Sequence, residues 1–408
     1  MPLILHPTPI TMKALHTTLL TLTSLITISH AATQPFTGIQ KTVLQKQGDN
    51  DVHTYRIPGL TTTKAGTLIA VFDLRHKNAA DLPGDIDIAA RRSTDHGQTW
   101  SPAAPVLDFD NTIPNSHGNG VGDPCILADL QTGTVFVAGL WSHGNKGWNT
   151  SQPGMSPDET GQFILTRSDD DGRTWSKPIN ITTQIKQPEW QLCLQGPGRG
   201  IQLKNGTLVM PAQFKEGHGD RIPHSFLIYS EDHGNTWKPS PPVVAPGQLP
   251  WTTEAQIAEL SDGQILISMR NHHPDKQRAW ATFQPNPTTG GLDDGQWSPI
   301  RYALNDPTCA AGLVHIPASS SQPHLILCSH ADSKTHRENM TVRLSRDNGN
   351  TWPVSRLIDP RPSAYSCLTI LADGSIGLLY ESGNNHPYEE LVFARFTLDW
   401  LKENTSTP

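Results

Sequence analysis

Six residues with charged or hydrogen-bonding side chains follow short apolar segments that are spread along most of the chain. They are Arg75, Trp141, Gln213, Arg270, His330 and Tyr380, the last of which is followed by Glu381. The guanidinium of an arginine is planar, keeps its charge, and can bind a carboxylate through two parallel hydrogen bonds. If these residues meet in the fold, they form a local site for an anion. Taken singly, each can also be an ordinary surface residue at the end of a strand.

The composition of the chain requires any such anion site to be local. The 408 residues include 31 basic and 38 acidic side chains, a formal net charge of −7, and charged residues make up only 17% of the total. This composition excludes a basic nucleic-acid-binding surface, and it excludes a highly charged disordered protein. An anionic substrate would therefore have to be bound by a few cations gathered in one place.

The apolar segments that precede these residues form a repeat. Each consists of a turn followed by a short strand-like run, and the six runs begin at Gly66, Gly133, Gly206, Gly263, Pro323 and Gly374. A spacing of roughly 50 to 70 residues is typical of a β-propeller with one four-stranded sheet per blade. The sequence therefore predicts an all-β fold, a single six-bladed propeller of residues 36–408 that is closed by its N- and C-terminal strands. Because equivalent strands run in the same direction, the residues that follow them should emerge on one face, near the axis.

A second repeat, Ser-x-Asp-x-Gly-x-Thr-Trp, occurs four times, at residues 93–100, 168–175, 230–237 and 345–352. The pattern predicts a hairpin turn in which Asp bonds nearby backbone, Gly adopts a positive φ and Trp packs between strands. A Ca²⁺-binding loop is the alternative, but the ligand series and terminal Glu of an EF-hand are missing.

These repeats occur together with three further motifs, and the combination resembles a known family. The motifs are Tyr55-Arg56-Ile57-Pro58, the segment 254–260, which begins Glu-Ala-Gln-Ile, and the segment 337–345, which begins Arg-Glu-Asn-Met. With the closing Gly-Leu-Leu-Tyr-Glu of residues 377–381, they make the chain similar to bacterial-type exo-α-sialidases (neuraminidases) of glycoside hydrolase family 33. The resemblance covers essentially the whole chain that follows residue 31. It implies hydrolysis of terminal sialic acids on glycoproteins, glycolipids and oligosaccharides, without a cofactor.

The same resemblance implies how the anionic sugar is bound. Sialic acid carries a carboxylate on its anomeric carbon, and the family binds this group with three arginines. The motifs place this role on Arg56, Arg270 and Arg337. Arg343 lies in the same segment as Arg337, and we expect it to have a structural role.

For the nucleophile, the resemblance points to Tyr380, because sialidases use a tyrosine where most retaining glycosidases use a carboxylate. A phenol with a pKa near 10 is a poor nucleophile at neutral pH and needs an adjacent base. The family's base matches Glu254. Glu259 and Glu381 are the competing carboxylates in the same segments.

The general acid is expected on a loop that carries Gly and Pro, and residues 76–87 form such a segment. The family places its acid six residues after an arginine, which selects Asp81. We expect the pKa of Asp81 to be raised, because an acid that donates a proton near neutral pH must still hold it. Asp85 and Asp87 are expected to cap the loop or the next strand.

Four further residues are assigned to the sugar-binding pocket by the same resemblance. Arg75 and Asp123 resemble the pair that contacts the 4-hydroxyl group, and Trp141 and Gln195 resemble residues that line the glycerol and N-acetyl pockets. For Trp141, packing between blades is the alternative. No His-Glu-x-x-His or His-x-His spacing is present, so no metal site is predicted.

Three other functions are compatible with these motifs. A trans-sialidase would keep the same residues and add an aromatic platform for an acceptor sugar. An intramolecular trans-sialidase would release an anhydro form of sialic acid. A sialic-acid-binding propeller without activity would tolerate the loss of Tyr380 or Glu254, and this chain retains both.

The N-terminal 31 residues have the pattern of a Sec-type signal peptide. Met12 and Lys13 precede a Leu-, Thr- and Ile-rich run that ends in Ser29-His30-Ala31. This pattern predicts cleavage after Ala31 and a secreted or periplasmic protein, and translation could begin at Met1 or at Met12. A membrane anchor is the alternative, but the run is shorter than the roughly 20 apolar residues of a span. No second apolar stretch follows, so no membrane span is expected in the mature protein.

The five cysteines are widely spaced, odd in number, and form no Cys-x-x-Cys pair. This pattern favours neither a disulfide framework nor a zinc site. Each lies in or beside an apolar run, so we expect buried free thiols.

Overall fold

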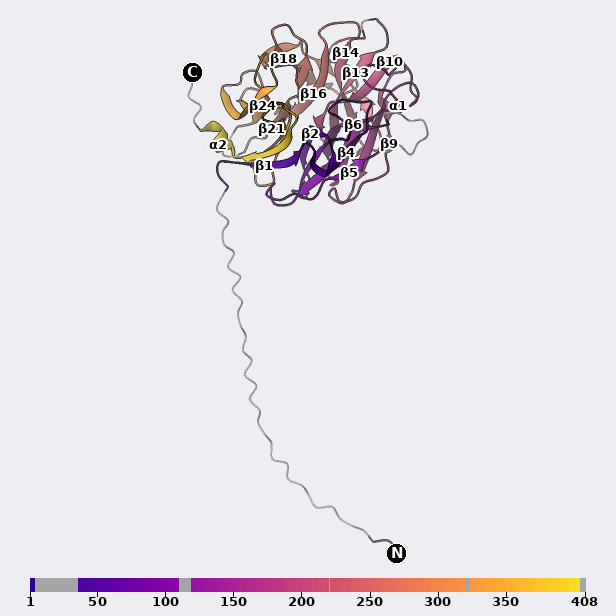
Figure 1. Cartoon of the computed structure of the whole chain (residues 1–408), viewed down its shortest axis with the longest axis vertical. Coiled ribbons are helices and arrows are strands. Elements are labelled where there is room, and N and C mark those ends of the chain that lie inside the picture. The colour runs from indigo at the N-terminus through magenta and orange to yellow at the C-terminus, as the bar shows by residue number, and fades with distance from the viewer. Residues whose placement is uncertain (4–35, 110–118, 220, 320–322, 404–408) are drawn as a thin grey trace. The chain divides into compact units, whose positions relative to one another are not determined.

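The computed structural model describes residues 1–3, 36–109, 119–219, 221–319 and 323–403 (Figure 1). Residues Thr37–Pro408 form one compact unit, and Met1–Phe36 form another. All but three residues of the predicted signal peptide, 1–31, lie outside the described residues, so its cleavage remains a prediction.

The larger unit is a six-bladed β-propeller, as the repeats predict. Each of its first three blades has four antiparallel strands in chain order. These are β2 (Thr54–Thr62), β3 (Leu68–Arg75), β4 (Ile86–Ser93) and β5 (Ala104–Leu107); β6 (Val121–Ala128), β7 (Val135–Trp141), β8 (Gln162–Ser168) and β9 (Ile179–Asn180); β10 (Trp190–Gln195), β13 (Leu208–Glu216), β14 (Pro223–Ser230) and β15 (Lys238–Pro239). Two short strands extend these sheets: β11 (Gly198–Arg199) pairs with β6, and β12 (Ile201–Gln202) pairs with β13.

The last three blades follow the same plan, except that one long strand serves two of them. Their strands are β16 (Thr252–Glu259), β17 (Ile265–Asn271), β18 (Gln277–Gln284) and β19 (Gln296–Trp297), with β20 (Arg301–Asn305) also on β18; β21 (Gly312–Ile316), β22 (Leu325–Ala331), β23 (Glu338–Ser345) and the first part of β24 (Val354–Ile370); and the second part of β24, β25 (Ile376–Ser382), β26 (Glu390–Phe396) and β1 (Ile39–Lys46). The described helical turns are η1 (Asp49–Asp51), α1 (Thr182–Ile185) and α2 (Leu398–Lys402).

The propeller is closed by its first and last strands. β1 pairs antiparallel with β26, from Ile39 opposite Phe396 to Lys46 opposite Glu390. The strand that comes first in the chain therefore completes the last blade, which confirms the predicted closure.

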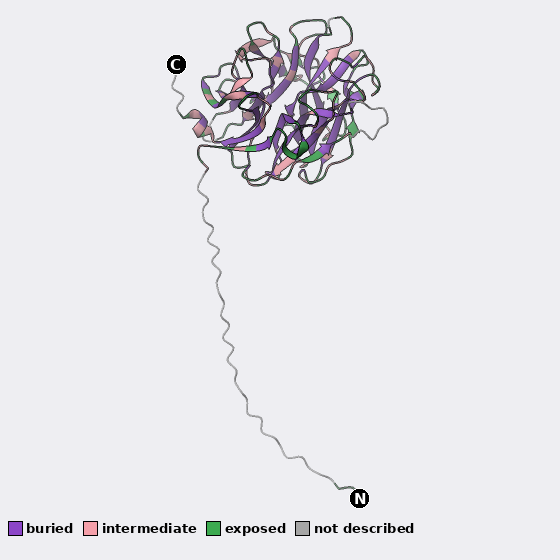
Figure 2. Ribbon diagram, viewed as in Figure 1, coloured by how far each residue is buried: buried purple, intermediate pink, exposed green. Residues whose placement is uncertain are grey.

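The six predicted apolar segments are the second strands of the six blades, namely β3, β7, β13, β17, β22 and β25. They are almost entirely buried because neighbouring blades pack against both faces (Figure 2). One hydrophobic cluster joins Phe136 and Phe163 of the second blade to Phe214 and Phe226 of the third. Continuous apolar runs fit such two-sided burial better than alternating patterns do. All five cysteines lie in this interior as free thiols, as predicted.

The four Ser-x-Asp-x-Gly-x-Thr-Trp repeats form the expected turns. In the repeat that begins at Ser93, the Ser hydroxyl donates to Asp95 at 2.8 Å, and Asp95 accepts from the backbone N–H of Thr99 at 2.9 Å. Gly97 has a φ of 83°, which glycine adopts without strain. The ring of Trp100 packs edge-on against Phe393 in the last blade. The repeats therefore stabilise turns and contacts between blades.

The first strand of each blade lies nearest the axis, and its two ends line cavities on opposite faces. Arg56, Asp123 and Glu254, near the beginnings of β2, β6 and β16, line one cavity. Residues near the ends of the same strands, among them Thr62 and Glu259, line another. Side chains from blades that are distant in sequence thus meet at each end of the axis.

Candidate active site

The cavity at the beginning of the first strands has a volume of about 270 Å³ and gathers charged groups from four blades and a phenol from a fifth. Its charged and phenolic side chains are Arg56, Asp81, Asp123, Glu254, Arg270, Arg337 and Tyr365. Six of these seven residues are assigned to the site from the sequence. The seventh, Tyr365, is not.

The three arginines of the predicted carboxylate clamp surround one aromatic ring. Arg56 comes from β2, Arg270 from the end of β17, and Arg337 immediately precedes β23. The guanidinium carbons of Arg56 and Arg337 lie 5.3 and 5.4 Å from the ring centroid of Tyr365. Arg270 donates from Nη1 to the hydroxyl oxygen of the same tyrosine at 2.8 Å. The predicted convergence of these three arginines is confirmed.

Arg337 differs from the other two arginines in its partners. It donates to the hydroxyl of Tyr388 at 2.9 Å and to the carbonyl of Thr308 at 3.0 Å. Within the described part of the chain, no carboxylate lies within ion-pair distance of its guanidinium. Its charge is therefore available to an anion that enters the cavity.

Tyr365 and Glu254 form the closest polar contact in the cavity. The Tyr365 hydroxyl donates to Glu254 Oε1 at 2.5 Å, and Glu254 Oε2 accepts from Arg270 Nη1 at 2.8 Å. The tyrosine is only 5% exposed. Burial, and then the negative charge of Glu254, raise the pKa of Tyr365 well above its ordinary value, although Arg270, Arg337 and Arg56 oppose this shift. Tyr365 is therefore a neutral phenol, and its hydroxyl is already hydrogen-bonded to Glu254, the carboxylate that can accept its proton.

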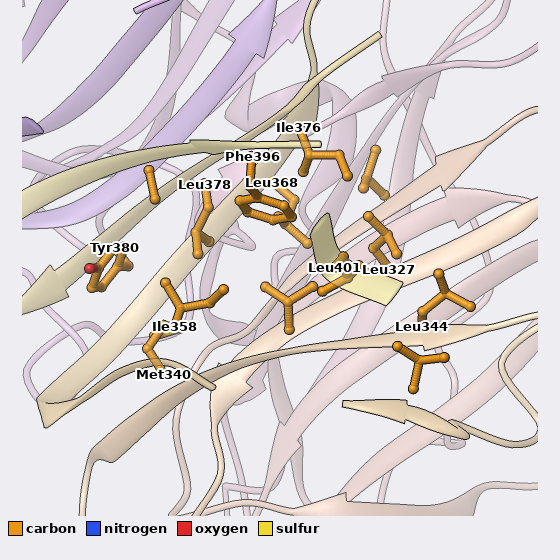
Figure 3. Packing of buried hydrophobic residues seen from close by; sticks show 14 of the residues in the cluster. Leu327, Met340, Leu344, Ile358, Leu368, Ile376, Leu378, Tyr380, Phe396 and Leu401 are labelled. Carbon is orange, nitrogen blue, oxygen red and sulfur yellow. The ribbon is translucent and has the colours of Figure 1, made fainter. Parts of the chain in front are cut away.

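The prediction that Tyr380 is the tyrosine of the site is wrong. Tyr380 is fully buried in the last blade, packed with Leu378 and Ile358 in a hydrophobic cluster (Figure 3). Its hydroxyl donates to Asp359 Oδ2 at 3.0 Å, and the residue does not line the cavity. The physical reason is its strand: Tyr380 lies on β25, the second strand of the blade, whereas Tyr365 lies on β24, beside the axis.

A signal for Tyr365 is present in the sequence. The first strands carry Arg56-Ile-Pro-Gly, Asp123-Pro-Cys-Ile, Glu254-Ala-Gln-Ile and Tyr365-Ser-Cys-Leu, each a chemically active residue just before an apolar run. Aligning the first strands of the blades, instead of the residues that follow the second strands, would have selected Tyr365.

The two carboxylates that compete with Glu254 have other partners. Glu381 is fully buried and accepts from Arg56 Nε at 3.1 Å, from the Ile57 N–H at 2.9 Å and from the Tyr365 N–H at 3.1 Å. It therefore ties β2 to β24. Glu259 lines the cavity at the opposite end of the axis and accepts from the Lys204 N–H at 3.0 Å. Of the three carboxylates, only Glu254 accepts a hydrogen bond from the Tyr365 hydroxyl.

Asp81 lies at the rim of the cavity, in the loop between β3 and β4, with a side chain that is 76% exposed. Arg75 Nη1 donates to its Oδ1 at 2.7 Å, and Arg56 Nη1 lies 3.5 Å from the same atom. Burial favours the neutral acid, but Arg75 and Arg56 outweigh it and hold the pKa of Asp81 below its ordinary value. The expectation that the pKa of Asp81 is raised is therefore wrong. Nearby, Asp87 pairs with His76 and Asp85 with Lys77, so both stabilise the loop.

Three residues assigned to sugar contacts do not line the cavity. Arg75 is 1% exposed and lies behind Asp81. Trp141 stacks on Phe109 at 4.7 Å and donates to Asn119, so the packing alternative holds for it. Gln195 is fully buried and donates to the backbone carbonyls of Gly122 and Asp123. The fourth residue, Asp123, does line the cavity.

Several lining residues were given no role from the sequence. Trp148 and Trp251 add aromatic surface, and Trp251 is 39% exposed beside His272, only three residues before Glu254. Thr253 adds a hydroxyl group, and Gln213, which the sequence did place among the converging residues, adds an amide group. An exposed aromatic at the rim of a polar cavity offers a flat apolar surface to a sugar or to another group attached to the substrate.

The described residues contain no cluster of three or more His, Cys, Asp or Glu side chains that could hold a metal ion. Nor do they include a helix that is long and apolar enough to cross a membrane. The titratable groups that line the cavity are guanidinium, carboxylate and phenol groups and the imidazole of His272.

The chain is similar to known proteins over most of its length. A family of BNR repeat-like domains matches residues 66–378. A sialidase of Bacteroides fragilis is 38% identical over 349 residues, which cover 83% of this chain and 62% of that protein. A sialidase of Micromonospora viridifaciens is 35% identical over 366 residues, which cover 88% of this chain and 54% of that protein. The chain thus spans less than two thirds of the length of these two relatives.

A solved structure is similar to this chain in both fold and sequence. A Hadza microbial sialidase superimposes with a TM-score of 0.80 at 41% sequence identity, covering 88% of this chain and 68% of the other. The sequence similarity therefore extends over most of the propeller.

Proposed function

This chain belongs to the sialidase family, and we propose that its cavity hydrolyses the bond between a terminal α-linked sialic acid and the rest of a glycan. The observation that carries this proposal is the Tyr365 hydroxyl, 2.5 Å from Glu254, within a ring of three arginines. Sialic acid is the sugar that requires both features, because its anomeric carbon bears a carboxylate beside the bond to be broken.

Arg56, Arg270 and Arg337 bind and orient that carboxylate. Guanidinium groups form paired, charge-assisted hydrogen bonds with carboxylates, so three of them fix the position of the anomeric carbon. The negative groups that hold the arginines, Glu381 at Arg56 and Glu254 at Arg270, keep them in place before the substrate arrives.

Tyr365 is the nucleophile and Glu254 its base. A neutral phenol does not repel the substrate carboxylate as a fourth acidic side chain in the cavity would. As the tyrosine oxygen forms its bond to the anomeric carbon, the phenolic proton moves to Glu254 across the existing hydrogen bond. The positive charge of Arg270 beside both oxygens stabilises the developing phenolate.

Asp81 protonates the leaving oxygen and later takes a proton from water. Although burial favours its neutral form, Arg75 and Arg56 lower its pKa, so Asp81 is ionised when no anion shares their charge. A substrate carboxylate bound to Arg56 neutralises part of this positive field and favours protonation of Asp81. Water then attacks the glycosyl-tyrosine intermediate, and sialic acid leaves with its anomeric configuration retained.

The substrates we propose are sialylated glycoproteins, glycolipids and oligosaccharides. A cavity of about 270 Å³ suits one terminal sugar residue, while the exposed Trp251 at its rim can contact the group that leaves. We also propose export to the periplasm or the medium, on the evidence of residues 1–31. Sequencing the N-terminus of protein recovered from outside the cytoplasm tests this, and a start at Ala32 is expected.

Proton NMR of a reaction with 3′-sialyllactose tests the proposed reaction directly. The α-anomer of free sialic acid should appear first and convert to the β-anomer afterwards. If the β-anomer appears first, the reaction inverts and a tyrosine nucleophile is ruled out. An anhydro sugar detected by mass would instead indicate an intramolecular trans-sialidase, and transfer to added lactose a trans-sialidase. No reaction with any sialoside would leave only a binding function.

A further inference from the structure

A buried aspartate that does not touch the cavity is joined to two of its carboxylate residues. Asp73 lies in β3, directly opposite Arg56 of β2, and is fully buried. It has no direct contact with the cavity, whose wall includes Asp81 and Asp123. Its two oxygen atoms lead to these two residues by separate routes.

The first route leads through Arg75 to Asp81. Asp73 Oδ2 accepts from Arg75 Nε at 3.1 Å and from Nη2 at 2.9 Å, so one edge of the guanidinium is held in a paired contact. The remaining terminal nitrogen, Nη1, donates to Asp81 Oδ1 at 2.7 Å and to the Ala79 carbonyl at 2.8 Å. Asp73 thereby fixes the orientation of the arginine that holds both the loop and the carboxylate of Asp81.

The second route leads to the backbone of Asp123. Asp73 Oδ1 accepts from the Asp123 N–H at 2.9 Å. Asp123 has a φ of 61°, a left-handed conformation that non-glycine residues rarely adopt without support. At Gly122, the residue before it, a Cβ would lie 3.3 Å from Asp73 Oδ1, so any larger residue there would press on this carboxylate. Asp73 therefore also holds the strained turn that aims Asp123 into the cavity.

The charge of Asp73 matters as much as its shape. Asp81 faces three cations, Arg56, Arg75 and Arg270, and one further acid, Asp123. Arg75 is the nearest of the cations, and the fully buried Asp73 pairs with it at 2.9 Å. Burial raises the pKa of Asp73 to about 6, although Arg75, the Asp123 N–H and Arg56 oppose this shift, so Asp73 is ionised at neutral pH with the support of these partners.

We propose that Asp73 is a positioning residue that holds the acid/base Asp81 through Arg75 and the sugar-contacting Asp123 through its backbone, and that offsets the charge of Arg75 so that Asp81 can take up a proton. This inference rests on the proposed sialidase function. It assigns to Arg75 a role behind the site in place of direct contact with substrate.

The substitution Asp73→Asn tests the role of the charge. Asparagine keeps the size and one acceptor oxygen but leaves Arg75 without its counter-charge. The uncompensated cation lowers the pKa of Asp81, so the protonated acid is lost at a lower pH. With sialyllactose, we expect kcat at neutral pH to fall about 10- to 100-fold and the alkaline limb of the pH profile to move to lower pH. With an aryl sialoside, whose leaving group needs no proton, kcat should fall by less than about threefold.

Two other variants separate this role from general stability. Asp129→Asn removes an equally buried aspartate at the opposite end of the axis, where it accepts from Gln131, Thr132 and Gln202. It should change neither the pH profile nor the ratio of the two substrates. Arg75→Lys keeps the cation but cannot hold Asp73 and Asp81 along two edges at once. It should impair sialyllactose more than the aryl sialoside with a smaller shift of the alkaline limb, and it serves if Asp73→Asn does not fold.

The outcomes are distinguishable from failure of the proposed function. If the unmodified protein cleaves neither substrate, the sialidase proposal fails and this inference fails with it. If the unmodified protein is active but Asp73→Asn and Arg75→Lys slow both substrates equally, without a change in pH profile, Asp73 is merely structural. Full activity of both variants on sialyllactose would also overturn the inference.

Discussion

Two tyrosines on neighbouring strands of the last blade each donate to a carboxylate, and only one of these pairs belongs to the cavity. Tyr365 on β24 donates to Glu254 at 2.5 Å, and Tyr380 on β25 donates to Asp359 at 3.0 Å. Both tyrosines are buried, and burial raises the pKa of both. The hydrogen bond alone therefore does not distinguish a nucleophile from a structural residue.

The two pairs differ in their surroundings. Three arginines surround Tyr365, and one of them donates to its hydroxyl oxygen. Tyr380 is surrounded by aliphatic side chains, and the cation nearest its carboxylate, Arg361, pairs with Asp359 at 2.9 Å. A phenol can act on a substrate only where there is room for the substrate and a cation to stabilise the phenolate. The first strand of the blade provides both.

Removing the two hydroxyl groups in turn should give the largest contrast. Tyr365→Phe deletes the nucleophile, and we expect kcat on sialyllactose to fall by at least about 10³-fold. Tyr380→Phe should stay within about twofold of the unmodified protein, because its hydroxyl faces Asp359 in the core. Steady-state kinetics of both variants measure the difference. Equal losses of kcat in the two variants would contradict the assignment of Tyr365 as the nucleophile.

Substitution of the two carboxylates, Glu254 and Asp359, should give the same contrast with a somewhat smaller effect on kcat. Glu254→Gln keeps a hydrogen bond to Tyr365 but cannot accept its proton, so kcat should fall about 10²- to 10⁴-fold. Asp359→Asn should leave kcat nearly unchanged. Measurement at several pH values guards against a simple shift of the optimum, and retention of most activity by Glu254→Gln argues against its role as base.

Substitution of Arg337 in the cavity and of Arg361 beside Asp359 should differ in its effect on substrate binding. Arg337→Lys keeps the charge but loses the forked geometry that binds a carboxylate, so KM should rise about 10- to 100-fold. Arg361→Lys makes the same change beside Asp359 and should leave KM unaltered. An unchanged KM for Arg337→Lys would remove it from the carboxylate clamp.

The smallest expected effect is on stability and belongs to the pair in the core. Tyr380→Phe removes one hydrogen bond to a buried carboxylate and should lower the free energy of unfolding by about 1–2 kcal/mol in urea titrations. Burial raises the pKa of Asp359, but Arg361 and Tyr380 outweigh it, and the pKa is lowered overall. A group with a lowered pKa stabilises the fold above its unfolded pKa of about 3.9 and loses this contribution as pH falls. The deficit of Asp359→Asn should therefore shrink below about pH 4, and a constant deficit would argue against an ionised Asp359.

Much of the fold could be predicted because it is repeated. The second strand of each blade recurs as a turn and an apolar run, and the Ser-x-Asp-x-Gly-x-Thr-Trp turns recur in four blades. The arginines of the clamp could also be predicted, since each lies in a local motif. These features depend on short stretches of chain, which a sequence displays directly.

Features that depend on contacts between segments distant in the chain were not predicted. Tyr365 is recognised by its distance from Glu254, 111 residues away in the chain. The lowered pKa of Asp81 depends on Arg56 from another strand as well as on Arg75 in its own hairpin. Trp141 and Gln195 lie at the ends of strands, as expected. Their polar groups donate hydrogen bonds to a neighbouring side chain and to a backbone carbonyl, and neither residue lines the cavity.

Covalent trapping tests the central claim most directly. A 2,3-difluorinated sialic acid should react with the nucleophile and hydrolyse slowly, because the fluorine beside the anomeric carbon destabilises the oxocarbenium-like transition state. After proteolysis, mass spectrometry should find the sugar attached to Tyr365, in the peptide that contains Ser363-Ala-Tyr-Ser. The label should be absent from Tyr365→Phe and present in Tyr380→Phe. Attachment to Tyr380, or to Glu254, would contradict the assignment of Tyr365 as the nucleophile.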